Sequence, residues 1–287
     1  MKNKVLTGLL LVLIGGWGSL SAQSAGSNYA RQVNTLIGTK GVGLTSGYLY
    51  PGATYPYGMV QFTPSYFSKR SGFVINQLSG GGCEHMGNFP TFPVKGKLKM
   101  SPDNILNYRI NISEEKGHAG YYEAKVQEDI HAKLTVTERT GMASYEYPAD
   151  QQYGTVIIGG GISATPIEQA AIVITAPNKC EGYAEGGNFC GLRTPYKVYF
   201  VAEFDTDALE SGTWKRDELK PNTTFAEGEY SGVYFTFDVN KKKNIQYKIG
   251  VSYVSVENAR ENLKAENTGW MNCRWLSIYF PAVGYLF

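Results

Sequence analysis

The stretch from Ser79 to Asn88 has the residue types with the most chemical potential, because three glycines precede a cysteine, a glutamate and a histidine. Cys83, Glu84 and His85 are side chains of the kind that bind zinc. Three adjacent residues seldom share one tetrahedral site, and the sequence has no second C-x-x-C or H-x3-H element. Glycines let a backbone approach a ligand or another domain closely. We therefore expect close approach in this stretch rather than a metal site.

Acid and base candidates elsewhere are scattered. His118 and His131 each stand alone, and we expect them to be surface or loop histidines. The sequence contains neither a P-loop nor a G-x-S-x-G nucleophile elbow. Adjacent carboxylates on a strand point to opposite faces and cannot act as an acid and base couple, which applies to Glu114-Glu115, Glu128-Asp129 and Asp217-Glu218. The residue types and their spacing alone predict no catalytic residue.

Residues 159–164 match the pattern G-x-G-x-x-A after a predicted strand. A dinucleotide-binding domain requires a helix directly after these glycines, so that the helix N-terminus faces the pyrophosphate. Thr165-Pro166 and a further apolar run occupy that place instead. We therefore expect a Gly-rich turn or loop there.

Two of the four cysteines, Cys180 and Cys190, are separated by a Gly-rich segment of nine residues. Export to an oxidising compartment would let this segment close as a disulfide loop. Two free, buried thiols are the alternative, because the Cα separation decides whether a bond forms. Cys83 and Cys273 have no obvious partner.

The first 22 residues have the organisation of a signal peptide, with basic Lys2 and Lys4, an apolar run over residues 5–14 and small residues up to Ala22. A retained anchor is the alternative, but a spanning helix needs about 20 apolar residues and glycines interrupt this run. We predict cleavage after Ala22 and no membrane span. No cysteine precedes Cys83, so a lipoprotein is not expected, and the predicted location is a bacterial periplasm or exterior.

The composition is that of a globular protein rich in turns. Hydrophobic residues make up 43% of the chain, which is ample for a buried core and excludes a disordered protein. Charged residues reach only 18% and no polybasic run stands out, so nucleic-acid binding is not expected.

Short apolar or alternating runs bounded by turn residues predict β-strands. Because no helix separates successive runs, the strands cannot be parallel crossovers, and we predict an all-β, antiparallel two-sheet β-sandwich. The predicted strands cover residues 55–62, 132–136, 144–147, 155–158, 171–175, 197–204, 232–239 and 245–256.

One helix is predicted over residues 257–267, leading away from the sandwich after the last strand. Residues 271–287 are almost uncharged and strongly apolar, which is unusual for a soluble domain. A reading-frame change or truncated gene is our first explanation, and a last strand that packs back is the alternative. The predicted organisation is a signal peptide (1–22), a β-sandwich (30–256), the start of a helical linker (257–270) and an atypical tail (271–287).

A series of motifs resembles the N-terminal domain of family 92 glycoside hydrolases, the calcium-dependent exo-α-mannosidases, in both order and spacing. The most specific are VNTLIGT at residues 33–39, YPGATYPYGMVQ at 50–61 and LSGGGC at 78–83. Residues 120–122, 137–141, 199–204 and 252–259 also look like that family, so the resemblance covers roughly residues 30–270.

The resemblance implies a galactose mutarotase-like supersandwich that normally precedes a larger (α/α)6 barrel through a helical linker. In the family the acid and base carboxylates, and most calcium ligands, lie in that barrel. An inverting glycosidase needs two carboxyl groups about 6.5–9.5 Å apart. We therefore expect this chain to be truncated before its catalytic domain, to bind no Ca2+ alone and to be inactive. The intact enzyme would bind Ca2+ and remove terminal α-1,2-linked mannose, as in N-glycan degradation.

The same resemblance implies that loops of this domain edge the sugar pocket. Glycines that only shape turns are the alternative. Ile75 and Gln77 stand where many members carry histidine, and Gly87-Asn88 where Gly-Asp is common; these departures bear on linkage preference rather than on the fold. The matching substrate-binding residues are Gly52, Ala53, Thr54, Ser79, Gly80, Gly81, Gly82 and Cys83.

The competing interpretation is a free-standing carbohydrate-binding sandwich. Aromatic side chains stack on sugars, although most are expected to fill the core. A half-pocket should bind mannose-containing glycans with a Kd no better than about millimolar, so micromolar affinity would favour the module. In the first interpretation the partner is the missing catalytic domain, in cis or in trans. A third possibility is a chain inert by itself, because its normally covered surface is exposed.

Overall fold

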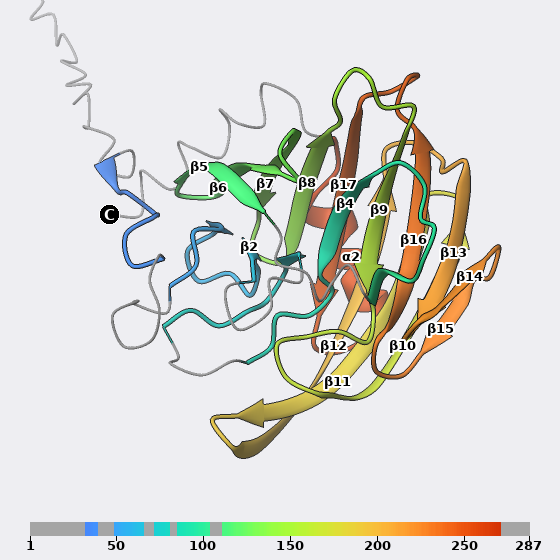
Figure 1. The fold of residues 1–287 in the computed structure, drawn as a ribbon. Helices are drawn as coiled ribbons and strands as arrows, with labels where there is room; N and C mark the ends of the chain where they lie inside the picture. Colours follow the sequence, from blue (N-terminus) through green and yellow to red (C-terminus); the bar gives the residue numbers. More distant parts are fainter. Residues whose placement is uncertain (1–31, 40–48, 66–71, 81–84, 104–110, 271–287) are drawn as a thin grey trace, which may run out of the picture.

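The computed structural model describes residues 32–39, 49–65, 72–80, 85–103 and 111–270, which form a β-sandwich (Figure 1). The predicted signal peptide and the atypical tail lie outside these residues. The two sheets have eight and nine strands, and all pairings between named strands are antiparallel. The predicted all-β, two-sheet fold is therefore confirmed.

Strands that are neighbours in space are often far apart in the sequence. In spatial order, the eight-stranded sheet contains β1 (Ala53–Thr54), β2 (Gln61–Pro64), β3 (Phe73–Val74), β4 (Thr91–Lys95), β9 (Tyr153–Gly159), β16 (Ser231–Asp238), β13 (Glu210–Lys215) and β14 (Glu218–Pro221). In the same order, the nine-stranded sheet contains β15 (Phe225–Glu227), β10 (Ile167–Ala176), β11 (Lys179–Phe189), β12 (Leu192–Phe204), β17 (Asn244–Ser252), β8 (Thr140–Glu146), β7 (Ile130–Val136), β6 (Tyr121–Val126) and β5 (Ile112–His118).

Aromatic rings join the two sheets at the centre of the core. Phe204 on β12 packs against Phe235 and Phe237 on β16, with ring centroids 4.9 and 5.1 Å apart. The same Phe204 ring lies 5.4 Å from Tyr247 on β17. Burying one such side chain contributes about 1.5–3 kcal/mol, so this cluster is a main source of attraction between the sheets.

All eight predicted strands overlap observed ones, but the run at residues 55–62 does so only at Gln61 and Phe62 of β2 and is otherwise wrong. Residues 55–58 form a turn in which Gly58 N donates to Tyr55 O at 3.1 Å. Tyr57 has a φ of 59° and is 99% exposed. Pro56 and Gly58 favour this turn, and the aromatic residues between them imitate a strand pattern. The Gly-rich segment after β9 leads into β10 without a helix, as expected.

The proposed Cys180–Cys190 disulfide is wrong. Cys180 is free and buried, whereas Cys190 is disulfide-bonded. The intervening segment is strand β11 rather than a loop, and a strand rises about 3.3 Å per residue, which places the two thiols roughly 30 Å apart. A disulfide requires Cα atoms within about 7 Å. The partner of Cys190 is therefore a cysteine other than Cys180.

Peptide mapping should show Cys180 as a free thiol and Cys190 as disulfide-bonded. Burial raises the pKa of the Cys180 thiol, so the native protein should resist alkylation there. After denaturation without reduction, Cys180 should alkylate while Cys190 stays bonded. Trypsin cuts after Lys179 and Arg193, so both residues fall on one peptide, which should be cross-linked to a second peptide. A Cys180–Cys190 bond inside that single peptide would contradict the structure.

Helix α2 (Val256–Glu266) matches the predicted helix, but it does not lead away from the sandwich. Ser255 caps its N-terminus by accepting from Asn258 N at 3.1 Å. Ala259 and Leu263 are buried against Val201 on β12, in a cluster separate from the main core. The apolar positions recur at helical spacing and need a surface to cover them, which draws the helix back onto the nine-stranded sheet.

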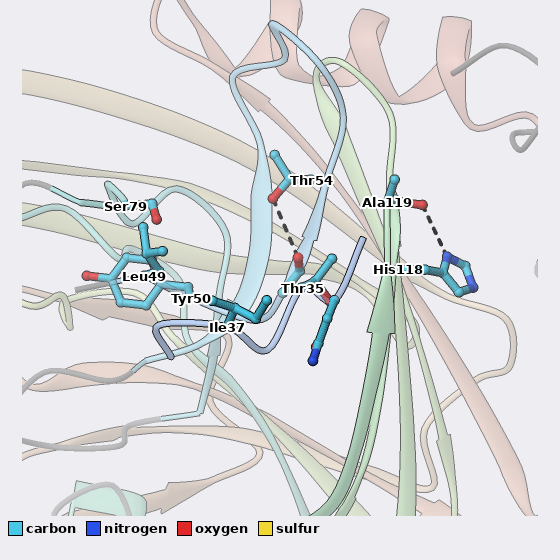
Figure 2. Close-up of a pocket in the computed structure, with 11 residues that line it drawn as sticks. Thr35, Ile37, Leu49, Tyr50, Thr54, Ser79, His118 and Ala119 are labelled. Carbon is cyan, nitrogen blue, oxygen red and sulfur yellow. Dashed lines mark hydrogen bonds between the residues drawn. The ribbon is translucent and has the colours of Figure 1, made fainter. Parts of the chain in front are cut away.

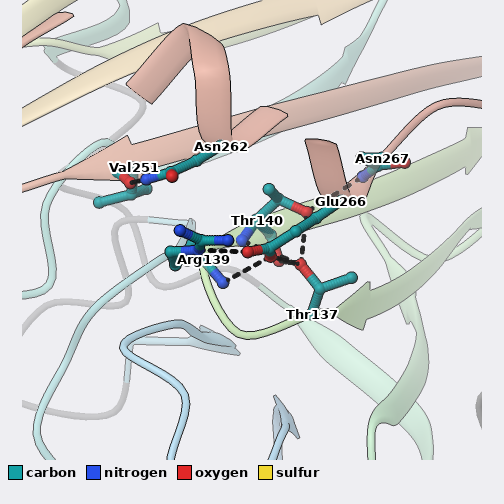
Figure 3. A network of polar contacts seen from close by, with 7 residues as sticks. All are labelled: Thr137, Arg139, Thr140, Val251, Asn262, Glu266 and Asn267. Carbon is teal, nitrogen blue, oxygen red and sulfur yellow. Dashed lines mark hydrogen bonds and ion pairs between the residues drawn. The ribbon is translucent and has the colours of Figure 1, made fainter. Parts of the chain in front are cut away.

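A polar network fixes the C-terminal end of α2 to the turn between β7 and β8 (Figure 3). The Glu266 carboxylate accepts from Thr137 Oγ1 at 2.5 Å and from Arg139 N at 2.9 Å, and it also pairs with the Arg139 guanidinium. Asn262 Nδ2 donates to Val251 O at 2.8 Å. The Glu266 side chain is only 14% exposed, so its interactions are partly shielded from water.

Glu266→Gln should lower the free energy of unfolding by about 1–3 kcal/mol, because it removes the charge from several partly buried hydrogen bonds. Urea denaturation would measure the change. Glu261→Gln is the matched control, since Glu261 lies on the same helix but is exposed, and a change within about 0.5 kcal/mol is expected. Equal effects of the two substitutions would show that the network does not stabilise the fold.

Candidate sugar-binding pocket

A pocket of about 290 Å3 lies where the edges of the two sheets meet (Figure 2). β1 is the edge strand of one sheet, while β5 and β6 end the other. The volume is at the lower end of the range for small-molecule sites, about 300–1,000 Å3, and suits one sugar ring rather than a chain. Its lining residues are Asn34, Thr35, Ile37, Leu49, Tyr50, Gly52, Thr54, Ser79, His118, Ala119 and Gly120.

The β1 wall of the pocket depends on close packing at Gly52. β1 pairs with β2 through Ala53 opposite Phe62 and Thr54 opposite Gln61. A Cβ added at Gly52 would lie 2.2 Å from Thr63 Cβ and 2.4 Å from Phe62 O. Any side chain there would push β1 away from β2, so Gly52 is required by packing as well as by its place in the wall.

The turn between β5 and β6 forms the opposite wall. Thr135 Oγ1 donates to Gly120 O at 2.9 Å, which ties this turn to β7. The His118 ring stacks on the Tyr121 ring, with centroids 4.8 Å apart. Tyr121 donates to Glu123 Oε2 at 2.6 Å, and burial together with this bond raises the pKa of the Tyr121 phenol. His118 therefore rests on a neutral, fixed ring.

The pocket offers hydroxyl, amide and imidazole groups beside an apolar surface. Its polar side chains include those of Asn34, Thr54 and Ser79, and Leu49 and the Tyr50 ring supply apolar contacts. None of the lining residues is an aspartate, glutamate, lysine or arginine. Such a lining suits a neutral polyol, because hydroxyls can be matched without burying a charge. It does not hold the carboxyl pair that glycoside hydrolysis requires.

Three of the residues implied by the family resemblance, Gly52, Thr54 and Ser79, come together in this pocket. Ala53 does not, because its side chain is fully buried in the core. Gly80 follows Ser79 with a φ of 72° and lies beside Leu49 rather than in the lining. Gly81, Gly82 and Cys83 fall outside the described residues. Sugar binding by any of these residues stays a prediction.

Two residues that line the pocket, Thr35 and His118, are not among the binding residues predicted from the sequence. Thr35 lies inside the VNTLIGT motif, but the sequence does not show that this motif lies beside a pocket. His118 has glycines on both sides of its turn, which is a signal of close approach. His85 is buried instead, with Nδ1 3.0 Å from Asn188 O, and His131 is exposed on β7.

Within the described part of the chain, no three His, Cys, Asp or Glu residues are grouped so as to hold a metal ion. His85 therefore belongs to no such group, while Cys83 and Glu84 lie outside the described residues. A carboxylate cluster that could bind the calcium implied by the family is likewise absent from these residues. No helix in this part of the chain is both long and apolar enough to span a membrane.

Two solved structures with folds similar to this chain are GH92 family glycoside hydrolases. The family GH92 alpha-mannosidase BT3965 from Bacteroides thetaiotaomicron has a TM-score of 0.75 and 23% identity, covering 90% of this chain and 38% of that one. The GH92 family glycosyl hydrolase ccman5 has a TM-score of 0.74 and 21% identity, with 88% and 36% covered. At these identities the similarity shows the fold alone. The fold is a β-sandwich domain of the kind that these two proteins contain.

The sequence comparisons identify the family. The model of the glycosyl hydrolase family 92 N-terminal domain matches residues 32–252, so the chain belongs to this family. An uncharacterized secreted glycosidase of Arthroderma benhamiae is 25% identical over 276 residues, which cover 83% of this chain and 35% of that protein. The chain thus spans about a third of the length of this relative.

Gly52→Ala should destabilise the protein more than Gly120→Ala, although both glycines line the pocket. At Gly52 the new Cβ would overlap with β2, at a cost of about 1–3 kcal/mol or more. At Gly120 the space is open, and the φ of 76° alone costs about 1–2 kcal/mol. Thermal and urea denaturation would measure both. A Gly52→Ala protein as stable as wild type would show that this glycine is not needed for packing.

Proposed function

We propose that the chain is the sugar-binding N-terminal part of an α-mannosidase, and that it holds a terminal mannose without hydrolysing it. The observation that carries this is the pocket, which has neutral polar groups suited to a sugar but no carboxylate in its lining. An inverting mechanism needs both an acid and a base carboxyl. Family membership supplies the substrate class, glycosides, and the mannosidases of similar fold favour mannose.

The catalytic groups would come from a second domain, in the same chain or a separate one. Longer relatives support this, since the chain spans about a third of their length. Exposed apolar side chains also support it, because a second domain would cover apolar surface that otherwise faces water. Those near the pocket end of the sandwich, which we call the end patch, are Tyr57, Met59, Leu78, Tyr253 and Val254.

Hydrogen bonds gather the end patch at one end of the sandwich. Met59 N donates to Glu138 O at 2.8 Å, and Asn76 Nδ2 donates to Tyr253 OH at 3.3 Å. Glu138 lies in the β7–β8 turn that Glu266 of α2 holds in place. The patch therefore sits beside the C-terminal end of α2, which we propose begins the linker to the second domain.

For the intact enzyme we propose release of terminal α-1,2-linked mannose, as in the degradation of N-glycans. The calcium of that enzyme would be bound by the second domain, because the described residues of this chain include no group of three carboxylate, imidazole or thiol side chains that could hold it. For location we propose export to a bacterial periplasm or exterior. The leader-like N-terminus supports export, and a relative is described as secreted.

A free-standing carbohydrate-binding module is the alternative function. The pocket itself favours neither alternative, but the end patch favours a covered domain over a free-standing one. Mannose affinity in the micromolar range would support the module, because a half-pocket should reach only about millimolar affinity.

The purified chain should release no sugar from an aryl α-mannoside or from α-1,2-mannobiose, while its pocket resonances should shift when mannose is added. Product analysis by chromatography and NMR titration would measure the two properties. Hydrolysis catalysed by the chain itself would refute the proposal that it binds mannose without hydrolysing it.

A double variant, Thr54→Val/Ser79→Ala, distinguishes true activity from a contaminant. It should lose most of the mannose-induced shifts because two hydroxyl groups of the pocket are removed. Hydrolysis that persists unchanged in the variant would come from another enzyme in the preparation. Shifts that persist unchanged would show that mannose binds elsewhere.

A further inference from the structure

One wall of the pocket differs from the others in how it is held. The segment of residues 34–39, which we call the strap, supplies Asn34, Thr35 and Ile37 to the lining. Its hydrogen bonds are all internal: Ile37 N to Asn34 O and Thr39 N to Leu36 O, both 3.3 Å, Leu36 N to Asn34 Oδ1 and Thr39 Oγ1 to Leu36 O. Within the described chain, none joins the strap to another segment.

Packing alone therefore holds the strap against the rest of the pocket. Figure 2 shows the strap passing between Tyr50 on one side and the His118–Ala119 turn on the other. A Cβ added at Gly117 would lie 2.5 Å from Thr35 Oγ1, so the two residues are in tight contact. Segments without hydrogen bonds to their surroundings open at low free-energy cost.

Two side chains of the strap, those of Thr35 and Ile37, lack suitable partners. Thr35 Oγ1 is buried without a hydrogen-bond partner in the described structure. Buried hydroxyl groups are normally paired, because leaving one unpaired costs free energy. Ile37 is 70% exposed although it lines the pocket. Both features would be relieved if the strap moved onto a sugar ring.

We infer that the strap closes over the bound sugar, with Thr35 Oγ1 and the Asn34 amide bonding its hydroxyl groups and Ile37 covering its apolar face. This inference rests on the proposed function, since it concerns the same pocket. The walls at β1 and at the β5–β6 turn stay fixed, because β1 pairs with β2 and Thr135 holds Gly120. Closure would exclude water from the sugar and set part of the specificity.

An engineered disulfide tests this movement. In Thr35→Cys/Gly117→Cys the two Cβ atoms would lie no more than about 4 Å apart, within reach of a disulfide, so the oxidised protein would hold the strap in its present position. NMR titration with mannose would compare the oxidised and reduced forms of this one variant. The lost Thr35 hydroxyl is then common to both forms, and only the freedom of the strap differs.

The reduced form should bind mannose about tenfold more tightly than the oxidised form, which corresponds to one or two net hydrogen bonds that the locked strap cannot make. Equal affinities, or tighter binding by the oxidised form, would overturn the inference. Wild type measured with and without reductant is the control for the native disulfide at Cys190. Absence of mannose binding by wild type would instead overturn the proposed function, and the strap inference with it.

Hydrogen exchange supplies a second measurement that needs no substitution. Amides of residues 34–39 should exchange rapidly in the free protein and slow several-fold at saturating mannose, while those of β2 stay unchanged. Slow exchange of the strap in the free protein would contradict a movable wall.

Discussion

Apolar packing between the two sheets is the constraint on which the pocket depends. Phe204 contacts rings from both sheets, and this contact holds the sheets face to face. The pocket lies at their edges, with β1 from one sheet and the β5–β6 turn from the other. Neither sheet alone would make a concave site. A sugar-binding function at this place therefore requires the closed sandwich.

The predictable part of the fold is the part with strong alternation. β12 and β16 carry aromatic and β-branched residues at regular spacing, and both were expected from the sequence. β11 was mistaken for a loop because Gly182 and Gly186 occupy buried positions where a strand normally shows large apolar side chains. The error about Cys180 and Cys190 follows from that mistake. The position of α2 against the nine-stranded sheet also depends on tertiary contacts, which helix propensity does not predict.

The pocket was predictable only in part. Family resemblance pointed to Gly52, Thr54 and Ser79, and the fold brings all three together. It could not show that Gly52 is held by packing against β2, since that contact involves backbone atoms. Thr35 and His118 reach the pocket from segments far apart in the chain, so the sequence does not show that they meet. The sequence predicts no catalytic residue, but it could not show which side chains line the pocket.

The central claim is that this family 92 domain binds a terminal mannose through neutral groups at the junction of its two sheets. A crystal structure of the chain at saturating mannose tests it most directly. We predict one sugar in the pocket, within hydrogen-bond distance of Thr54 and Ser79, with no aspartate or glutamate flanking its anomeric carbon. A sugar bound elsewhere, or two carboxyl groups on opposite sides of the anomeric carbon, would contradict the account.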